Sequence, residues 1–163
     1  QFLLEAMKDV PARLLVIGNG PMETEWKQLA SALNIAEKVS FLGEIGGEQL
    51  PSFYGATDIF VLPACERSEA FGLVQVEAMA SALPVISTEL GTGTSFVNKD
   101  GETGLVVRPK DPASLKNAIL YLLNNPGIRH EMGTRGRQRA IEEFALETMA
   151  DRVLNLYQTF NSA

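Results

Sequence analysis

Two carboxylates in the stretch "EAFGLVQVE" have the type and spacing needed to hold a hydroxylated ligand. Glu69 lies in a polar loop, and Glu77 follows eight positions later inside an apolar run. If a helix begins near Phe71 or Gly72, Glu69 precedes its N-terminus and Glu77 lies about one and a half turns in, on the face that meets the ligand edge. An ionised carboxylate there can accept both hydrogens of a vicinal diol, as on a ribose. The amides of Phe71, Gly72 and Leu73 can bind an oxygen of a sugar or phosphate.

Each carboxylate also has a purely structural explanation. Glu69 can compensate the positive end of the helix dipole. Glu77 stands among apolar neighbours, where a charge is costly unless it is solvated or paired, so a buried ion pair with a lysine or arginine is the alternative for it. Spacing alone leaves both explanations open.

Three glycine-containing loops indicate where a ligand would lie. They are "GNGP" (18–21), with Gly18 and Gly20, "ACERSEAFG" (64–72) and "LGTGTS" (90–95). Each runs from a predicted strand toward a helix, so each can direct free backbone amides at a common, phosphorylated ligand. The structural alternative is that the glycines only make turns. Neither "GNGP" nor "GTGTS" satisfies the Walker pattern, and the full dinucleotide fingerprint is absent after "LLVIG".

The elements that position these loops are short apolar runs alternating with helical patterns. The runs cover residues 13–18, 38–43, 58–63, 83–88 and 104–109. This alternation predicts an α/β fold, a Rossmann-like doubly wound parallel sheet with helices on both faces, whose ligands gather at the carboxyl ends of the strands. The nearly continuous apolar run 13–18 predicts a strand covered on both faces. Sheet and crossover helices extend to about residue 109, and residues 110–163 are predicted to form helices alone.

The start of the pattern indicates a longer protein. Gln1 already stands in a helical pattern, with no strand before it to feed a crossover helix. We therefore expect residues 1–163 to be an N-terminally truncated domain.

Composition favours an ordinary globular domain. The 163 residues are 45% hydrophobic, and a net charge of -6 offers no basic field for nucleic acid. The single cysteine, Cys65, excludes an internal disulfide and a multi-cysteine metal site, and is expected to be a small core residue in a reducing compartment. His130, the only histidine, is expected on the surface, so no histidine triad can form. No apolar run reaches the roughly 18 residues that a membrane span needs.

Several segments together resemble a known family. The stretch "SEAFGLVQVEAMASALPVIST" resembles the glutamate-x7-glutamate motif and following strand of retaining GT-B glycosyltransferases, in the glycosyltransferase group 1 (glycogen-synthase-like) family. "LLVIGNGP", "VSFLGEI", "FYGATDIFVLPA" and "DGETGLVV" stand in the order found in the C-terminal half of such enzymes. The resemblance covers residues 1 to about 145. It implies one half of a GT-B fold, the nucleotide-sugar-binding domain, without the acceptor-binding N-terminal domain.

The resemblance also implies roles for individual residues. Glu77 matches the glutamate that binds the ribose hydroxyls, and Glu69 matches the one beside the donor sugar, which makes it the candidate catalytic residue. The remaining expected contacts are to the sugar and diphosphate, from the backbone of Phe71, Gly72 and Leu73, and to the nucleobase, from Glu44 and Ile45. Such enzymes need no divalent metal and no other cofactor, and the nucleotide-sugar is a substrate.

Two departures from the family pattern are visible. Where many relatives have a "GG-x-x-E" pattern, this chain reads "GTGTS", with Ser95 near the position of the glutamate. The arginine and lysine that relatives use to neutralise the donor diphosphate belong just upstream of Gln1. Arg67 is a candidate partial substitute, and a surface salt bridge to Glu66 or Glu69 is the alternative for it.

The expected function is donor binding within a glycosyltransferase. The whole enzyme would transfer a sugar from a UDP-, GDP- or ADP-linked donor to a hydroxyl of a saccharide or lipid-linked acceptor, with retention of configuration, whereas this domain alone would be inactive. The expected location is the cytoplasm, with peripheral attachment to the inner membrane face through the missing half left open.

Two rival functions are weighed against this expectation. One is a sugar-nucleotide or phosphate-ligand module without catalysis, which the two glutamates argue against. The other is a flavodoxin-like or receiver-type domain, which needs a flavin loop or an acidic pocket. Asp58 lies at the wrong end of its strand for such a pocket.

Overall fold

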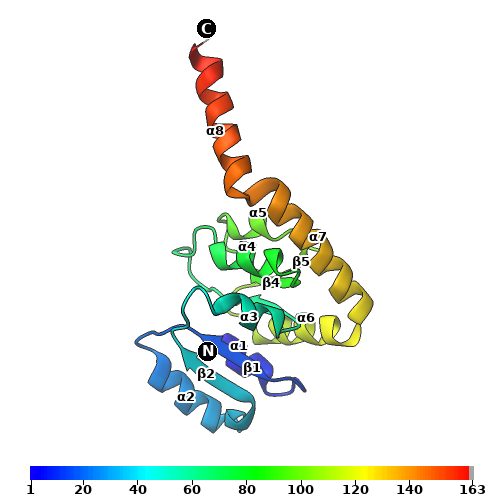
Figure 1. Cartoon of the computed structure of the whole chain (residues 1–163). Coiled ribbons are helices and arrows are strands. Elements are labelled where there is room, and N and C mark those ends of the chain that lie inside the picture. Colours follow the sequence, from blue (N-terminus) through cyan, green and yellow to red (C-terminus); the bar gives the residue numbers. More distant parts are fainter. Residues whose placement is uncertain (162–163) are drawn as a thin grey trace.

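The computed structural model describes residues 1–161, with helices on both faces of parallel strands (Figure 1). Each of the five predicted apolar runs contains a strand, and the pattern after residue 109 is helical as predicted. The strands are β1 (Leu14–Ile17), β2 (Val39–Gly43), β3 (Phe60–Leu62), β4 (Val85–Thr88) and β5 (Gly104–Val107). The α-helices are α1 (Phe2–Met7), α2 (Glu23–Ala32), α3 (Leu50–Gly55), α4 (Leu73–Ala80), α5 (Thr94–Val97), α6 (Pro112–Asn124), α7 (Pro126–Phe144) and α8 (Leu146–Asn161), and a 3₁₀ turn covers Ala36–Lys38.

All strand pairs are parallel, which confirms the predicted α/β class. Within residues 1–161 the strands form two sheets instead of one continuous sheet: β1 pairs with β2, and β4 lies between β3 and β5. Within residues 1–161, β1 and β3 each keep one edge without a strand partner. In the doubly wound order 3-2-1-4-5-6, strand 1 lies between strands 2 and 4. The break between β1 and β3 corresponds to the position of that strand.

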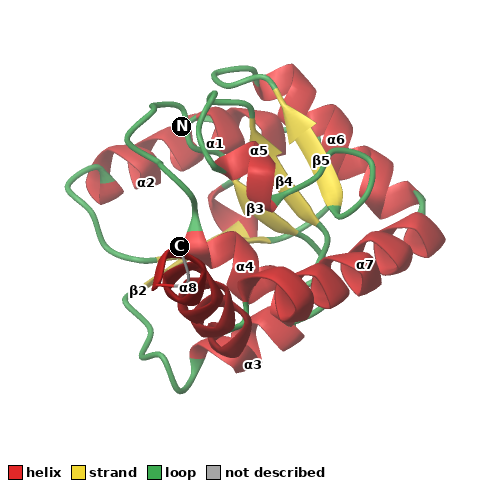
Figure 2. Cartoon of the chain, turned by 90° about the horizontal axis from the view of Figure 1, so that it is seen from above, coloured by secondary structure: helices red, strands yellow, loops and turns green. Residues whose placement is uncertain are grey.

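Helices lie on both faces of the three-stranded sheet (Figure 2), and a hydrophobic cluster packs on each face. One joins α1, α2 and α6 and includes Ile86 of β4, and the other joins α3, α4, α5 and α7 and includes Val85. Successive residues of a strand point to opposite faces, so neighbouring residues of β4 serve different clusters. Every residue of β4 is buried, as expected for the central strand of such a sheet.

The prediction that the run 13–18 is covered on both faces is wrong. Leu14 and Val16 of β1 pack against the cluster that contains α1 and α2. Leu15 and Ile17 point to the opposite face, and each is 38% exposed. Although β1 is apolar throughout, helices within residues 1–161 do not cover both of its faces.

The C-terminal helices begin with a capped turn and end away from the sheet. Asp111 accepts a hydrogen bond from the Ser114 amide at 3.0 Å, and Pro112 occupies the first turn of α6, the two roles for which Asp and Pro are favoured at a helix start. Helix α7 lies across α4, and α8 then extends away from the domain (Figure 1). One side of α8 displays an exposed apolar stripe of Leu146, Met149, Val153, Leu156 and Phe160.

Close contact between α7 and α4 depends on a glycine. A Cβ built on Gly133 of α7 would lie 2.0 Å from the carbonyl oxygen of Ala82, in the turn that follows α4. A Cβ on Gly136 would meet the Met79 side chain at an ordinary 3.4 Å. Because Gly133 has no side chain, α7 can lie directly against that turn.

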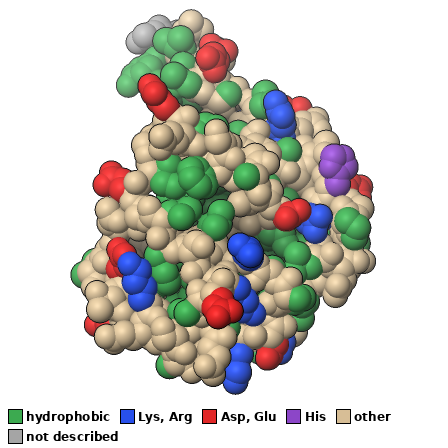
Figure 3. Space-filling model, turned by 60° about the horizontal axis from the view of Figure 1, so that its bottom comes forward, with side chains coloured by type: hydrophobic (Ala, Val, Ile, Leu, Met, Phe, Trp, Pro, Cys, Tyr) green, Lys and Arg blue, Asp and Glu red, His purple; other side chains and the backbone are tan. Residues whose placement is uncertain are grey.

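The surface mixes charges of both signs. On the face seen in Figure 3, Lys and Arg side chains alternate with Asp and Glu, and hydrophobic areas lie between them. Across residues 1–161, no helix is both long enough and apolar enough to span a membrane. The described helices thus offer no candidate span, and His130 is exposed as predicted.

Candidate functional site

The N-terminus of α4 forms the centre of the predicted site. The helix begins at Leu73, and Gly72 before it has a left-handed φ of 75°. A Cβ on Gly72 would lie 2.7 Å from Gln75 Nε2 and 2.8 Å from Leu62 Cδ2, so both conformation and space require glycine here. In the described part of the chain the amides of Phe71, Gly72 and Leu73 donate to no protein group. They carry the donors and the positive dipole end that the sequence predicted for this turn.

Gln75 supports this turn and was missed in the sequence analysis. It is fully buried in the first turn of α4, and its Nε2 donates to the carbonyl of Phe71 at 3.1 Å and to that of Thr94 at 3.4 Å. Its Oε1 has no partner among residues 1–161. The available signal was a polar residue within the apolar pattern "GLVQVE", since a buried amide is expected to hold neighbouring backbone.

The loops after β3 and β4 are bonded to each other. The Thr92 hydroxyl donates to the carbonyl of Glu69 at 2.9 Å, and the Gly93 amide donates to that of Ala70 at 2.7 Å. A Cβ on Gly93 would lie 2.8 Å from the same Ala70 oxygen. This glycine is therefore required by the close approach of two loops and does more than complete a turn.

Arg67 does not form the salt bridge to Glu66 or Glu69 that was the alternative to its role at the diphosphate. Its guanidinium donates to the carbonyl of Gly91 at 3.2 Å, while Glu66 pairs with Lys110 at 2.6 Å. The Glu66 carboxylate raises the pKa of the Lys110 ammonium through this hydrogen bond and its charge. Arg67 thus links the same two loops at the ligand edge.

Glu77 lies on the exposed side of α4 rather than among apolar side chains. Its Oε2 accepts a hydrogen bond from the Tyr54 hydroxyl at 2.9 Å. It forms no ion pair with any lysine or arginine in residues 1–161, so the buried ion pair weighed as its structural explanation is absent. Burial, together with the Glu77 hydrogen bond and charge, raises the pKa of Tyr54 well above its usual value. Tyr54 therefore stays protonated and donates.

Glu69 is half-buried in the loop that precedes α4. Its backbone is held by the Thr92 contact, whereas its carboxylate has no hydrogen-bond or ion-pair partner in the described chain. This carboxylate is thus available to a ligand or to solvent.

The loops after β1 and β2 form a second pair. The Gly18 amide donates to the carbonyl of Gly43 at 2.7 Å, so this predicted phosphate donor is already occupied, because the start of the loop continues the β1–β2 ladder. Gly20 and Glu44 are exposed, and Ile45 is half-buried. These residues follow the carboxyl ends of their strands as predicted.

The two loop pairs are connected indirectly. No hydrogen bond within residues 1–161 joins the loops after β1 and β2 to those after β3 and β4. The hydrogen bond between Tyr54 of α3 and Glu77 of α4 links the elements that follow them. The structure thus brings the predicted site residues to the strand ends as two groups.

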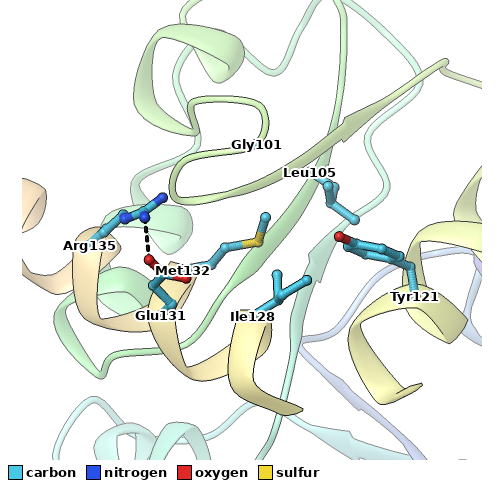
Figure 4. Close-up of a pocket in the computed structure, with 7 residues that line it drawn as sticks. All are labelled: Gly101, Leu105, Tyr121, Ile128, Glu131, Met132 and Arg135. Carbon is cyan, nitrogen blue, oxygen red and sulfur yellow. Dashed lines mark hydrogen bonds and ion pairs between the residues drawn. The ribbon is translucent and has the colours of Figure 1, made fainter. Parts of the chain in front are cut away.

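A groove of about 500 Å³ lies elsewhere, between α6, α7 and the turn before β5 (Figure 4). Its lining is mostly apolar, and Arg135 and Glu131 of α7 pair at its rim. The lining residues are Gly101, Leu105, Tyr121, Ile128, Glu131, Met132 and Arg135, none of which was predicted as a site residue. Gly101 precedes β5, so the groove lies at the amino end of that strand, opposite the end at which parallel sheets collect ligands.

Comparison with known proteins agrees with this fold. The family model described as glycosyl transferases group 1 matches residues 1–139. The chain is 37% identical over 137 residues to D-rhamnosyltransferase WbpZ of Pseudomonas aeruginosa, covering 84% of this chain and 36% of that protein. It is 33% identical over 167 residues to a GDP-mannose-dependent monoacylated alpha-(1-6)-phosphatidylinositol monomannoside mannosyltransferase of Corynebacterium glutamicum, covering 96% and 43%. The solved structure of Anabaena Alr3699/HepE in complex with UDP matches with a TM-score of 0.89 at 21% identity, over 97% of this chain and 44% of that one.

The parallel strands, crossover helices and strand-end loops define a Rossmann-like domain of the GT-B type. The chain belongs to the glycosyl transferases group 1 family, a family of enzymes. It spans about two fifths of the length of the curated relatives compared, between 36% and 43%.

Proposed function

We propose that residues 1–163 are the donor-binding domain of a retaining glycosyltransferase. The whole enzyme would transfer a sugar from a nucleotide-sugar to an acceptor hydroxyl, and the acceptor, a saccharide or a lipid-linked saccharide, would bind to an N-terminal domain outside this chain. The single cysteine leads us to place it in a reducing compartment, the cytoplasm, with any membrane attachment made by that other domain.

The observation that carries this proposal is the state of Glu77. Its carboxylate is exposed and, within residues 1–161, has one neutral hydrogen-bond donor and no cation as partner, so most of its acceptor sites are free. It projects from the helix whose free N-terminal amides face the strand ends. A nucleoside diphosphate fits both features, because its ribose diol donates hydrogen bonds and its phosphates accept them.

The proposed chemistry assigns separate tasks to the two glutamates. Glu77 binds the ribose, and Glu69 faces the donor sugar and stabilises positive charge at its anomeric carbon. The bond from that carbon to the diphosphate breaks with the electron pair on the diphosphate, and the acceptor oxygen bonds to the same face. The acceptor proton passes to the leaving oxygen. Amides of Phe71, Gly72 and Leu73 stabilise the departing charge, without a divalent metal and with cations from outside this chain.

Substitution of Glu77 in the full-length protein tests this assignment. Glu77→Ala removes two hydrogen bonds to a charged group, each contributing about 1.5–3 kcal/mol, so affinity for UDP or GDP should fall by about a hundredfold or more in titration calorimetry. The matched control is Glu131→Ala, since Glu131 is also an exposed helical carboxylate with one side-chain partner. Unchanged nucleotide affinity in a folded Glu77→Ala protein refutes the assignment.

Substitution of Glu69 separates transfer from binding. Glu69→Ala should lower kcat for sugar transfer far more than it raises KM for the donor, because the proposed contact is strongest in the transition state. Full kcat with a raised KM would reduce Glu69 to a binding residue. Nucleotide-sugar binding by the parent without transfer or hydrolysis would identify the protein as a non-catalytic module.

A further inference from the structure

The Glu77 carboxylate has most of its hydrogen-bonding capacity free, although it must adopt one orientation to bind a diol. It is exposed on α4, and within the described chain its only side-chain partner is the Tyr54 hydroxyl at 2.9 Å. A glutamate has several rotatable bonds, and immobilising it on binding costs free energy. A contact that orients it in advance therefore raises ligand affinity.

Tyr54 is itself firmly held. It is 9% exposed, and its ring packs edge-on against Phe60 of β3 with 6.0 Å between ring centroids. The Thr57 hydroxyl and amide both donate to its backbone carbonyl. The phenol oxygen thus has a fixed position from which to orient the carboxylate.

The chemistry of the partner suits a carboxylate that must remain available. A lysine or arginine would compete with an incoming diol for the negative charge, whereas a phenol donates one hydrogen bond and leaves the charge in place. Burial raises the pKa of Tyr54, so its proton stays on the phenol throughout the neutral range. One oxygen of Glu77 and the remaining lone pair of the other stay free for two hydroxyl groups.

Tyr54 also connects two parts of the site. It lies on α3, directly after the loop that holds Glu44 and Ile45, and its partner lies on α4, after β3. No β-ladder joins β2 to β3 within residues 1–161. The hydrogen bond therefore fixes α3, which follows the loop after β2, against α4, which follows the loop after β3.

We propose that Tyr54 is a positioning residue that holds the Glu77 carboxylate in the orientation that receives the ribose diol. The proposal rests on the proposed function, in that the ligand is a nucleoside diphosphate whose ribose contacts Glu77. Tyr54 itself does not touch the ligand.

The test is nucleotide binding to the full-length protein, with and without the phenol oxygen. Tyr54→Phe keeps the ring against Phe60 and removes only the hydroxyl. By calorimetry, its dissociation constants for UDP, GDP and ADP should rise about fivefold. The matched control, Tyr121→Phe, removes a hydroxyl on α6 at the distant groove and should change nothing. With the 2′,3′-dideoxy nucleotides, parent and Tyr54→Phe should bind equally.

The comparison of ribo- and dideoxynucleotides within one sample separates positioning from folding, because a partly unfolded variant loses affinity for both. In a Glu77→Ala background, Tyr54→Phe should cause no further loss. In turnover, Tyr54→Phe should raise KM for the donor and leave kcat unchanged.

Each contrary outcome has a distinct meaning. Equal UDP affinity in Tyr54→Phe and the parent, or equal weakening of ribo- and dideoxynucleotides, overturns the positioning role while the proposed function stands. If Glu77→Ala also binds like the parent, or if the parent binds none of the three nucleotides, the proposed function falls and the role of Tyr54 falls with it.

Discussion

The tight approach of α7 to the turn after α4 makes a sharp prediction for Gly133→Ala. The added Cβ would lie 2.0 Å from the Ala82 carbonyl oxygen and 2.9 Å from its carbon, whereas ordinary contact begins near 3.4 Å. Both sides of this contact are backbone, so a side-chain rotation cannot relieve it. Helix α7 must move away and loosen its packing on α4.

The magnitude follows from two opposing terms. Overpacking of this kind costs about 1–3 kcal/mol, or more where backbone must shift. Replacing glycine by alanine within a helix returns about 0.5–1 kcal/mol. The free energy of unfolding should therefore fall by about 2 kcal/mol, which lowers Tm by about 4–8 °C for a chain of this size.

The measurement is thermal unfolding of the 163-residue chain by circular dichroism. Two glycines of the same helix are matched controls: Gly127 has no atom within 4 Å of a built Cβ, and Gly136 meets Met79 at ordinary distance. Gly127→Ala and Gly136→Ala should leave Tm unchanged or raise it slightly. If Gly133→Ala melts at or above the temperature of Gly127→Ala, the close approach of the two segments is not as described.

Two further predictions concern buried and capping side chains. Asn98 is fully buried and its amide donates to the carbonyls of Val85 and Leu105, so Asn98→Ala should reduce the free energy of unfolding by about 3 kcal/mol in urea titrations, while exposed Asn117→Ala should not. The pKa of Asp111 is lowered, chiefly by the side-chain and backbone hydrogen bonds from Ser114, so its stabilising effect is present above the ordinary value of 3.8 and is lost as the pH falls through the lower folded pKa. Asp111→Ala should thus melt below the parent at pH 7, and the two should converge in acid; a gap that is independent of pH would contradict this.

Local signals were sufficient to predict the elements of the fold. Short β-rich apolar runs mark each strand because burial between helices requires them, and the "DP" at 111 and 112 marks the start of α6 because it supplies a cap and a fixed φ. The break between the β1–β2 sheet and the β3–β4–β5 sheet was not predictable from these signals. The apolar sequence of residues 13–18 would be the same whether β1 paired with a strand on one side or on both sides.

The environment of Glu77 was misjudged for a physical reason. Its sequence neighbours Val76 and Ala78 are apolar, but successive residues of a helix point about 100° apart, so sequence neighbours do not surround a side chain. Only the contact between α3 and α4 identifies its partner, and Tyr54 stands 23 positions earlier. The position of Glu77 on the helix was predictable, and its partner was not.

The bonded loops at residues 64–72 and 89–95 have a practical consequence for redesign. Since Gly93 fits only because it has no side chain beside Ala70, a segment grafted from a relative into one loop would meet a mismatched surface on the other. The two loops should therefore be exchanged together, and Gly93 should be retained at their point of contact.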